Sequence, residues 1–120
     1  MVNVFVYGSL MNTYWNHHYL SNCEFIGTGL LEGFEMYHVS SFPGIIVKPG
    51  EIVLGEVYSV DPRTLKTLDR LESEGSMYIR REEIIKIEED TINAFVYVWN
   101  GDIRPGCKKV EKMPWRPREG

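Results

Sequence analysis

A glutamate on the apolar face of a predicted helix is the residue of this sequence best suited to proton transfer. At about 100° per residue, Leu65, Leu68 and Leu71 form one apolar stripe, and Glu72 falls within it. Burial disfavours the charged form of a carboxyl group, and the negative end of the helix dipole acts in the same direction, so we expect the pKa of Glu72 to be raised. Such a group can exchange protons near neutral pH. The alternative is that Glu72 lies at a frayed helix end and reaches solvent.

A glycine turn at residues 7–10 (YGSL) is the second candidate feature, because it follows a short buried strand. Such a turn can present consecutive backbone N–H groups to an anion or to a developing oxyanion. Many strands end in glycine with no ligand nearby, so the turn alone is a weak signal. No second glycine followed by Lys and Ser or Thr completes a phosphate loop, and Ser9 does not fit the G-x-S-x-G spacing of a nucleophilic serine.

The histidines and cysteines do not predict a metal site or a nucleophile. Adjacent His17 and His18 would point about 100° apart on a helix, which hinders joint ligation. Neither they nor His38 belong to a Cys or carboxylate cluster with a zinc-binding spacing, so we predict no metal. A pairing of Cys23 with a histidine has no support, because proximity in space cannot be read from the sequence.

Composition limits the classes of partner. The 120 residues carry a net charge of −4, with 43% hydrophobic and 25% charged residues, as in an ordinary globular domain. The acidic balance argues against a nucleic-acid partner, and no apolar stretch approaches the roughly 20 residues that a membrane span needs. Two cysteines and no signal-peptide pattern predict a reduced, cytoplasmic protein. The basic residues near the C-terminus are interpreted as a solvated end: Lys108, Lys109, Lys112, Arg116 and Arg118.

The elements that must position these residues are mostly strands. Apolar runs bounded by glycine, proline and acidic residues predict strands over residues 2–7, 23–31, 33–39, 45–48, 52–60, 77–87 and 92–99, and a short helix over residues 12–20. Asp61 and Pro62 are an N-cap and a first helical residue, and the helix that they begin should end near residues 73–75. Six or seven strands and one good helix predict an α+β domain whose sheet is mixed or curled into a small barrel.

Three segments together resemble the gamma-glutamyl cyclotransferase-like superfamily, specifically its short branch of gamma-glutamylamine cyclotransferase-like proteins. They are residues 4–10 (VFVYGSL), residues 55–61 (GEVYSVD), and residues 68–72 (LDRLE) followed by Tyr78 and Arg80. An Asn-His pair at residues 16–17 and a Pro-Gly turn at residues 43–44 also match. The resemblance covers most of residues 2–99, so we predict a domain over residues 1–100 and a C-terminal tail over residues 101–120 without a recognisable motif, in which Trp115 is a candidate anchor.

The resemblance implies a fold, a site and a reaction. The fold is a small mixed β-barrel flanked by one main helix and short helices. The catalytic carboxylate is Glu72, with Glu74 a nearby carboxylate that does not match; Tyr7, Gly8, Ser9 and Leu10 form the substrate-binding loop, and Tyr78 lines the pocket.

The implied reaction is cyclisation of a small-molecule gamma-glutamyl amine or gamma-glutamyl amino acid to 5-oxoproline, with release of the free amine and without a cofactor or metal. The alternative is a non-catalytic small-molecule binding or regulatory module on the same fold, since fold does not guarantee function. The sequence leaves the identity of the gamma-glutamyl compound and the oligomeric state open.

Overall fold

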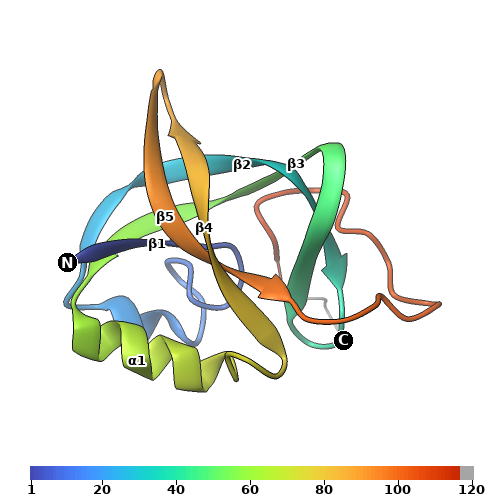
Figure 1. Ribbon diagram of the computed structural model, residues 1–120, viewed down its shortest axis with the longest axis horizontal. Coiled ribbons are helices and arrows are strands. Elements are labelled where there is room, and N and C mark those ends of the chain that lie inside the picture. The colour runs from blue at the N-terminus through green and yellow to red at the C-terminus, as the bar shows by residue number, and fades with distance from the viewer. Residues whose placement is uncertain (117–120) are drawn as a thin grey trace.

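The computed structural model describes residues 1–116. Within them the chain forms five strands, one α-helix and a single 3-10 turn, joined by loops (Figure 1). In chain order they are β1 (Val2–Val6), η1 (His17–Leu20), β2 (Glu24–His38), β3 (Pro43–Val60), α1 (Pro62–Leu71), β4 (Tyr78–Ile87) and β5 (Asp90–Trp99).

The strands close into a barrel in the order β1-β3-β2-β4-β5. β1 pairs antiparallel with β3 on one side and parallel with β5 on the other, and the remaining pairs are antiparallel. Val4 and Phe5, at the middle of β1, are completely buried. The predicted α+β fold with a small mixed barrel is therefore confirmed.

Two of the predicted strand breaks are wrong, because glycines bend the strands there without ending them. β2 continues through Gly33, which has a φ of +87°, and β3 continues through Gly50, which has a φ of +91°. The β2–β3 register shifts between Glu32 and Phe34, and residues 48–51 of β3 have no partner there. An irregularity of this kind bends a strand pair, and Figure 1 shows β3 turning sharply along its length. Five strands consequently replace the six or seven that were predicted.

The predicted helix over residues 12–20 is also wrong except at its end, where the 3-10 turn η1 forms. Thr13 has a φ of 77°, a left-handed conformation that no α-helix contains. Asn12 donates its backbone N–H to the Glu56 carboxylate over 2.8 Å, and the Asn16 amide donates to Ser9. These polar residues therefore hold the segment as a series of turns rather than as a helix.

α1 begins where its sequence predicts, and its end positions Glu72. The Asp61 carboxylate accepts a hydrogen bond from the Thr64 N–H over 2.6 Å, which is the expected N-cap. Leu68 is fully buried against the barrel, and Figure 1 shows α1 running beside it below β1. The last helical residue is Leu71, slightly earlier than predicted, and Ser73 with a φ of 51° turns the chain toward β4.

The C-terminal segment packs into the same core as the barrel. Lys109 pairs with Tyr37 of β2 in an isolated bridge, and Val110 donates its N–H to the Met36 carbonyl over 2.8 Å. Trp115 is 1% exposed, and its ring meets that of Tyr14 at a centroid distance of 5.6 Å. The predicted anchor is therefore confirmed, whereas Arg118 lies outside the described residues.

Across the part of the chain that the structure describes, no helix is both long and apolar enough to cross a bilayer.

Candidate active site

One cleft brings together all the site residues that the sequence predicted. It is lined by the end of β1 and the loop after it, the loop before β3, the end of α1, and facing residues of β4 and β5. The lining residues are Phe5, Val6, Tyr7, Gly8, Ser9, Leu10, Phe42, Pro43, Glu72, Tyr78 and Tyr97. The loop after β1 and the end of α1 are far apart in sequence, so the barrel is what places Glu72 beside the glycine turn.

Glu72 is partly buried, and its carboxyl group has no partner among residues 1–116. It is the C-cap of α1, and its backbone N–H donates to the Leu68 carbonyl over 2.9 Å. Its side chain makes no hydrogen bond and no ion pair with any described residue. Burial raises its pKa to about 7. Protonated and ionised forms of Glu72 are therefore both populated near neutral pH, and the inward position expected from the leucine stripe is the one observed.

The loop after β1 offers free donors to the same cleft. The backbone N–H groups of Gly8, Ser9 and Leu10 donate to no other group of residues 1–116. A side chain at Gly8 would place its Cβ 3.0 Å from the Pro43 ring, so glycine is what lets the two loops meet. Free amides of this kind bind anionic groups.

Asn16 and His17 hold this loop in place. The Asn16 backbone N–H donates to the Ser9 carbonyl over 3.1 Å, and its side-chain amide donates to the Ser9 hydroxyl over 2.8 Å. The His17 Nδ1 lies 3.0 Å from the Leu10 carbonyl oxygen. Because a carbonyl only accepts, Nδ1 carries the proton of that hydrogen bond.

Three tyrosines surround Glu72, and burial raises the pKa of each. Tyr7 donates its hydroxyl to the Tyr97 carbonyl over 2.5 Å, and Tyr78 donates to the Pro43 carbonyl over 2.6 Å. Tyr97 donates to the Asp69 carboxylate over 2.7 Å. All three phenols therefore remain protonated at neutral pH and have fixed orientations.

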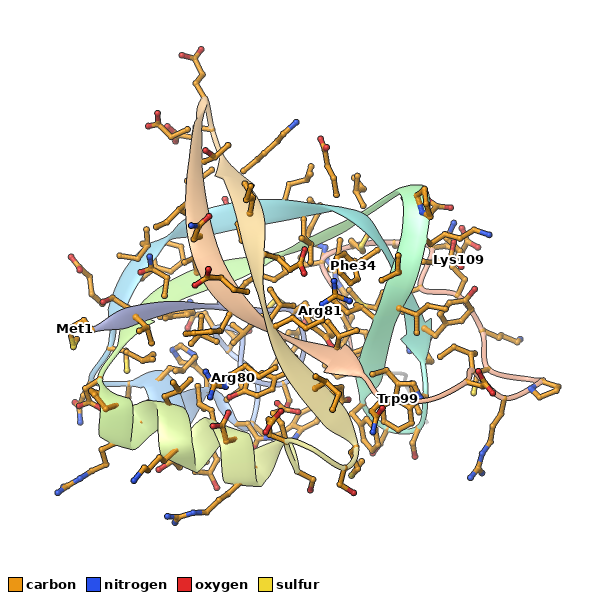
Figure 2. The ribbon with its side chains drawn as sticks, viewed as in Figure 1. Met1, Phe34, Arg80, Arg81, Trp99 and Lys109 are labelled. Atoms are coloured by element: carbon orange, nitrogen blue, oxygen red, sulfur yellow. The ribbon has the colours of Figure 1, made fainter. Side chains whose placement is uncertain are left out.

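The sequence reasoning missed Tyr97, which lines the cleft, and Asp69, which accepts the Tyr97 hydrogen bond. Asp69 lies 3.0 Å from Nε of Arg80, which extends from β4 toward α1 (Figure 2) and covers the ring of Phe95 at 4.5 Å. Asp69 and Arg80 belong to the matching LDRLE…Y-x-R pattern, so the signal for Asp69 was present. Nothing in the pattern of residues 92–99 distinguishes Tyr97 from an ordinary core aromatic residue.

The other candidates do not form a metal centre or a nucleophilic pair. Among residues 1–116, no group of three or more His, Cys, Asp or Glu side chains is placed to share a metal ion. Cys23 and His17 border a second groove, but burial raises the pKa of the Cys23 thiol. A nucleophilic cysteine needs the reverse shift.

Comparison with known proteins defines the class to which this fold and cleft belong. The sequence profile of the family described as "Gamma-glutamyl cyclotransferase, AIG2-like" matches residues 4–117. The chain belongs to this family, which confirms the resemblance drawn from its motifs. The match also runs through most of the C-terminal segment, where the sequence reasoning found no usable motif.

Individual relatives match along nearly the whole chain. The gamma-glutamylcyclotransferase family protein YtfP of Escherichia coli K12 is 31% identical over 118 residues, covering 98% of this chain and 99% of that protein. The crystal structure of an AIG2-like protein from Mus musculus is similar with a TM-score of 0.81 at 28% identity, covering 100% and 98% of the two chains. An uncharacterized protein from Pyrococcus horikoshii has a TM-score of 0.75 at 27% identity, covering 92% and 86%.

Proposed function

We propose that this protein is an enzyme that cyclises a gamma-glutamyl amine or gamma-glutamyl amino acid to 5-oxoproline and releases the free amine. The observation that carries the proposal is the cleft itself, in which an unpaired, partly buried Glu72 lines the same space as the free amides of residues 8–10. Family membership supports the same class of reaction.

The reaction is an internal amide exchange that balances without water or an oxidant. The substrate's α-nitrogen attacks its own γ-carbonyl carbon, so a new C–N bond closes a five-membered lactam. The original bond from that carbon to the leaving nitrogen then breaks. Because nucleophile and electrophile are tethered, correct folding of the substrate can supply an effective molarity of about 10⁵ M or more.

Glu72 is placed to move the proton that this exchange requires. Its carboxylate takes a proton from the substrate's α-ammonium, and the resulting carboxyl group passes it to the leaving nitrogen. The ring nitrogen loses a second proton as the lactam forms, and the released amine takes up that proton to leave as its ammonium form. A pKa of about 7 makes both forms accessible at neutral pH. Such acid–base catalysis contributes about 10²–10⁴-fold in rate.

The loop after β1 supplies the complementary electrostatics. The N–H groups of Gly8, Ser9 and Leu10 bind the substrate's α-carboxylate or the oxyanion that forms at the γ-carbon. Asn16 and His17 fix the loop before substrate arrives, and donors held in advance stabilise developing charge without reorganising.

Cys23 and Cys107 are both free, in keeping with a cytoplasmic location.

A substrate panel tests the proposal. The protein is incubated with gamma-glutamyl-lysine, other gamma-glutamyl amines and several gamma-glutamyl amino acids, and 5-oxoproline is measured by mass spectrometry. We expect release from at least one compound and loss of release in Glu72→Gln. Ligand-induced thermal stabilisation without any 5-oxoproline would support the binding module instead.

A further inference from the structure

The hydrogen bonds around the cleft assign a role to Tyr97 that neither the motifs nor the family name contains. We propose that the phenolic oxygens of Tyr97 and Tyr78 are fixed as acceptors for the substrate's α-ammonium group, with Asp69 as the positioning residue for Tyr97. The inference rests on the proposed function and specifies how the cleft orients the reacting nitrogen.

The direction of the Tyr97 hydrogen bond follows from its partner. Asp69 is paired with Arg80, and a carboxylate has only acceptor sites, so Tyr97 is the donor in the 2.7 Å contact. A phenol has one proton. Once that proton is directed at Asp69, the oxygen of Tyr97 can offer only lone pairs to a ligand in the cleft.

Tyr78 is arranged in the same way. Tyr78 gives its proton to the Pro43 carbonyl, which again only accepts, and its oxygen keeps acceptor capacity. Tyr7 gives its proton to the backbone carbonyl of Tyr97 over 2.5 Å, which joins Tyr7 to β5 as part of the cleft wall.

The loop after β1 has the opposite polarity. The Asn16 amide donates to the Ser9 hydroxyl oxygen over 2.8 Å, which leaves the Ser9 proton free to donate. Together with the free amides of residues 8–10, this gives a set of donors on the loop. The acceptors, Glu72, Tyr78 and Tyr97, come from the end of α1, β4 and β5.

Separated donors and acceptors in one cleft fit a zwitterion. The α-carboxylate of an amino-acid head group requires donors, and its α-ammonium carries three N–H donors that require acceptors. Placing the ammonium among Tyr97, Tyr78 and Glu72 brings the nitrogen to the carboxylate that must deprotonate it. The tyrosine oxygens then accept hydrogen bonds from the two remaining N–H groups, and the nitrogen lone pair is free for attack.

A pair of small probes isolates recognition of the ammonium. L-glutamine and glutaramate (5-amino-5-oxopentanoate) have the same chain and carboxylate, and glutaramate lacks only the α-amine. Dissociation constants are measured by protein-detected NMR titration for wild type and each variant. We expect wild type to bind L-glutamine at least about tenfold more tightly than glutaramate, as hydrogen bonds to a charged group predict.

Tyr97→Phe keeps the ring and removes the acceptor, so its preference for L-glutamine should fall about tenfold while glutaramate binding is unchanged. Asp69→Ala releases the Tyr97 proton to point into the cleft, and we expect it to lower the same preference. Tyr37→Phe is the matched control: its hydroxyl also donates to a carboxylate, that of Glu35, but outside the cleft. It should keep the wild-type preference.

Thermal melting checks that each variant is folded, and the ratio of the two dissociation constants is insensitive to a uniform loss of stability. Wild type that binds both probes equally, or binds neither, overturns the proposal, as does an unchanged preference in Tyr97→Phe. The release of 5-oxoproline is measured separately. A retained preference for L-glutamine without 5-oxoproline from any substrate would refute the enzyme while leaving the ammonium site standing.

Discussion

Glu35 is buried and Glu72 is partly buried, and their surroundings shift the pKa values of these two glutamates in opposite directions. Glu35 on β2 is 6% exposed, accepts a hydrogen bond from the Tyr37 hydroxyl, and lies 3.5 Å from the Lys109 ammonium. The Tyr37 hydrogen bond is the main reason that its pKa is lowered. Glu72 has no such partner, and burial alone raises its pKa to about 7.

The comparison separates a structural carboxylate from a reactive one. Lys109 also pairs with Glu51 over 2.7 Å, so the cluster around Glu35 fastens the C-terminal segment, where Figure 2 places Lys109, to β2 and β3. Burial of a charge is tolerated there because the charge is paired. The Glu72 carboxylate has no cation and no hydrogen-bond donor beside it among the described residues. A bound substrate can therefore supply the proton or the cation. An unpaired buried carboxyl in a cleft therefore indicates function more strongly than burial itself.

The largest expected effect comes from replacing the unpaired glutamate. Glu72→Gln keeps the size of the side chain and removes proton exchange, so turnover should fall about 100-fold or more with little change in substrate binding. The measurement is 5-oxoproline release under saturating and limiting substrate. Glu35→Gln is the control for loss of a buried negative charge, and its turnover should stay near that of wild type. Equal losses in the two variants would remove the distinction between them.

The pH dependence of stability should reveal the same contrast. Below the unfolded pKa of about 4.3, Glu72 is protonated in both states and its burial has no electrostatic cost. Between that value and the folded pKa of about 7 the cost grows, and it is fully present above pH 7. Chemical unfolding of both proteins is measured at several pH values. The free energy of unfolding of Glu72→Gln, relative to that of wild type, should increase by about 2–3 kcal/mol from pH 4 to pH 8. A constant difference across that range would mean that Glu72 titrates normally.

Activity should follow the ionised form of Glu72. Because the carboxylate is the base in the first step, kcat/KM should rise with pH through the folded pKa of about 7. A profile that is flat from pH 5.5 to pH 8 would contradict the assignment of Glu72 as the base.

A smaller effect is expected from replacing Lys109, the cation that pairs with Glu35. Lys109→Met removes the ammonium that faces Glu35 and Glu51, and we expect a modest decrease in the free energy of unfolding near neutral pH. The lowered pKa of Glu35 means that its contribution is present above the unfolded pKa and disappears as the pH falls through the folded value. Unfolding curves of wild type and Lys109→Met should therefore converge in acid. Convergence at high pH instead would show that the cluster acts in another way.

Local sequence signals predicted the elements that position the site, and they failed where tertiary contacts override them. Asp61, Pro62 and the leucine stripe define α1 and place Glu72 inward, because capping and periodicity are properties of neighbouring residues. The sequence around Gly33 and Gly50 predicts strand ends, whereas the sheet bends at these residues, and only the strand register distinguishes an end from a bend.

Tyr97 illustrates the remaining gap. The continuous apolar run over residues 94–99 predicts burial of Tyr97, but its hydrogen bond to Asp69 joins two elements that are adjacent only after the barrel has closed. The resemblance supplied Glu72 and the loop after β1 because those residues lie within short motifs. A role that depends on where a single hydroxyl proton points requires the three-dimensional contact.

The smallest expected effect belongs to Glu74, the carboxylate nearest to Glu72 in sequence. Glu74 is exposed, and one of its oxygens accepts the Arg80 backbone N–H over 3.2 Å, a contact that the side-chain oxygen of glutamine can also make. Glu74→Gln should therefore change the free energy of unfolding by no more than about 0.5 kcal/mol and leave turnover close to wild type. Measured beside Glu72→Gln with the same substrate, it separates a role for the cleft carboxyl from a general effect of removing negative charge near the end of α1. Loss of turnover in Glu74→Gln with activity retained in Glu72→Gln would transfer the proton-transfer role to Glu74, and the cleft in which Glu72 lies would no longer be the site of the reaction.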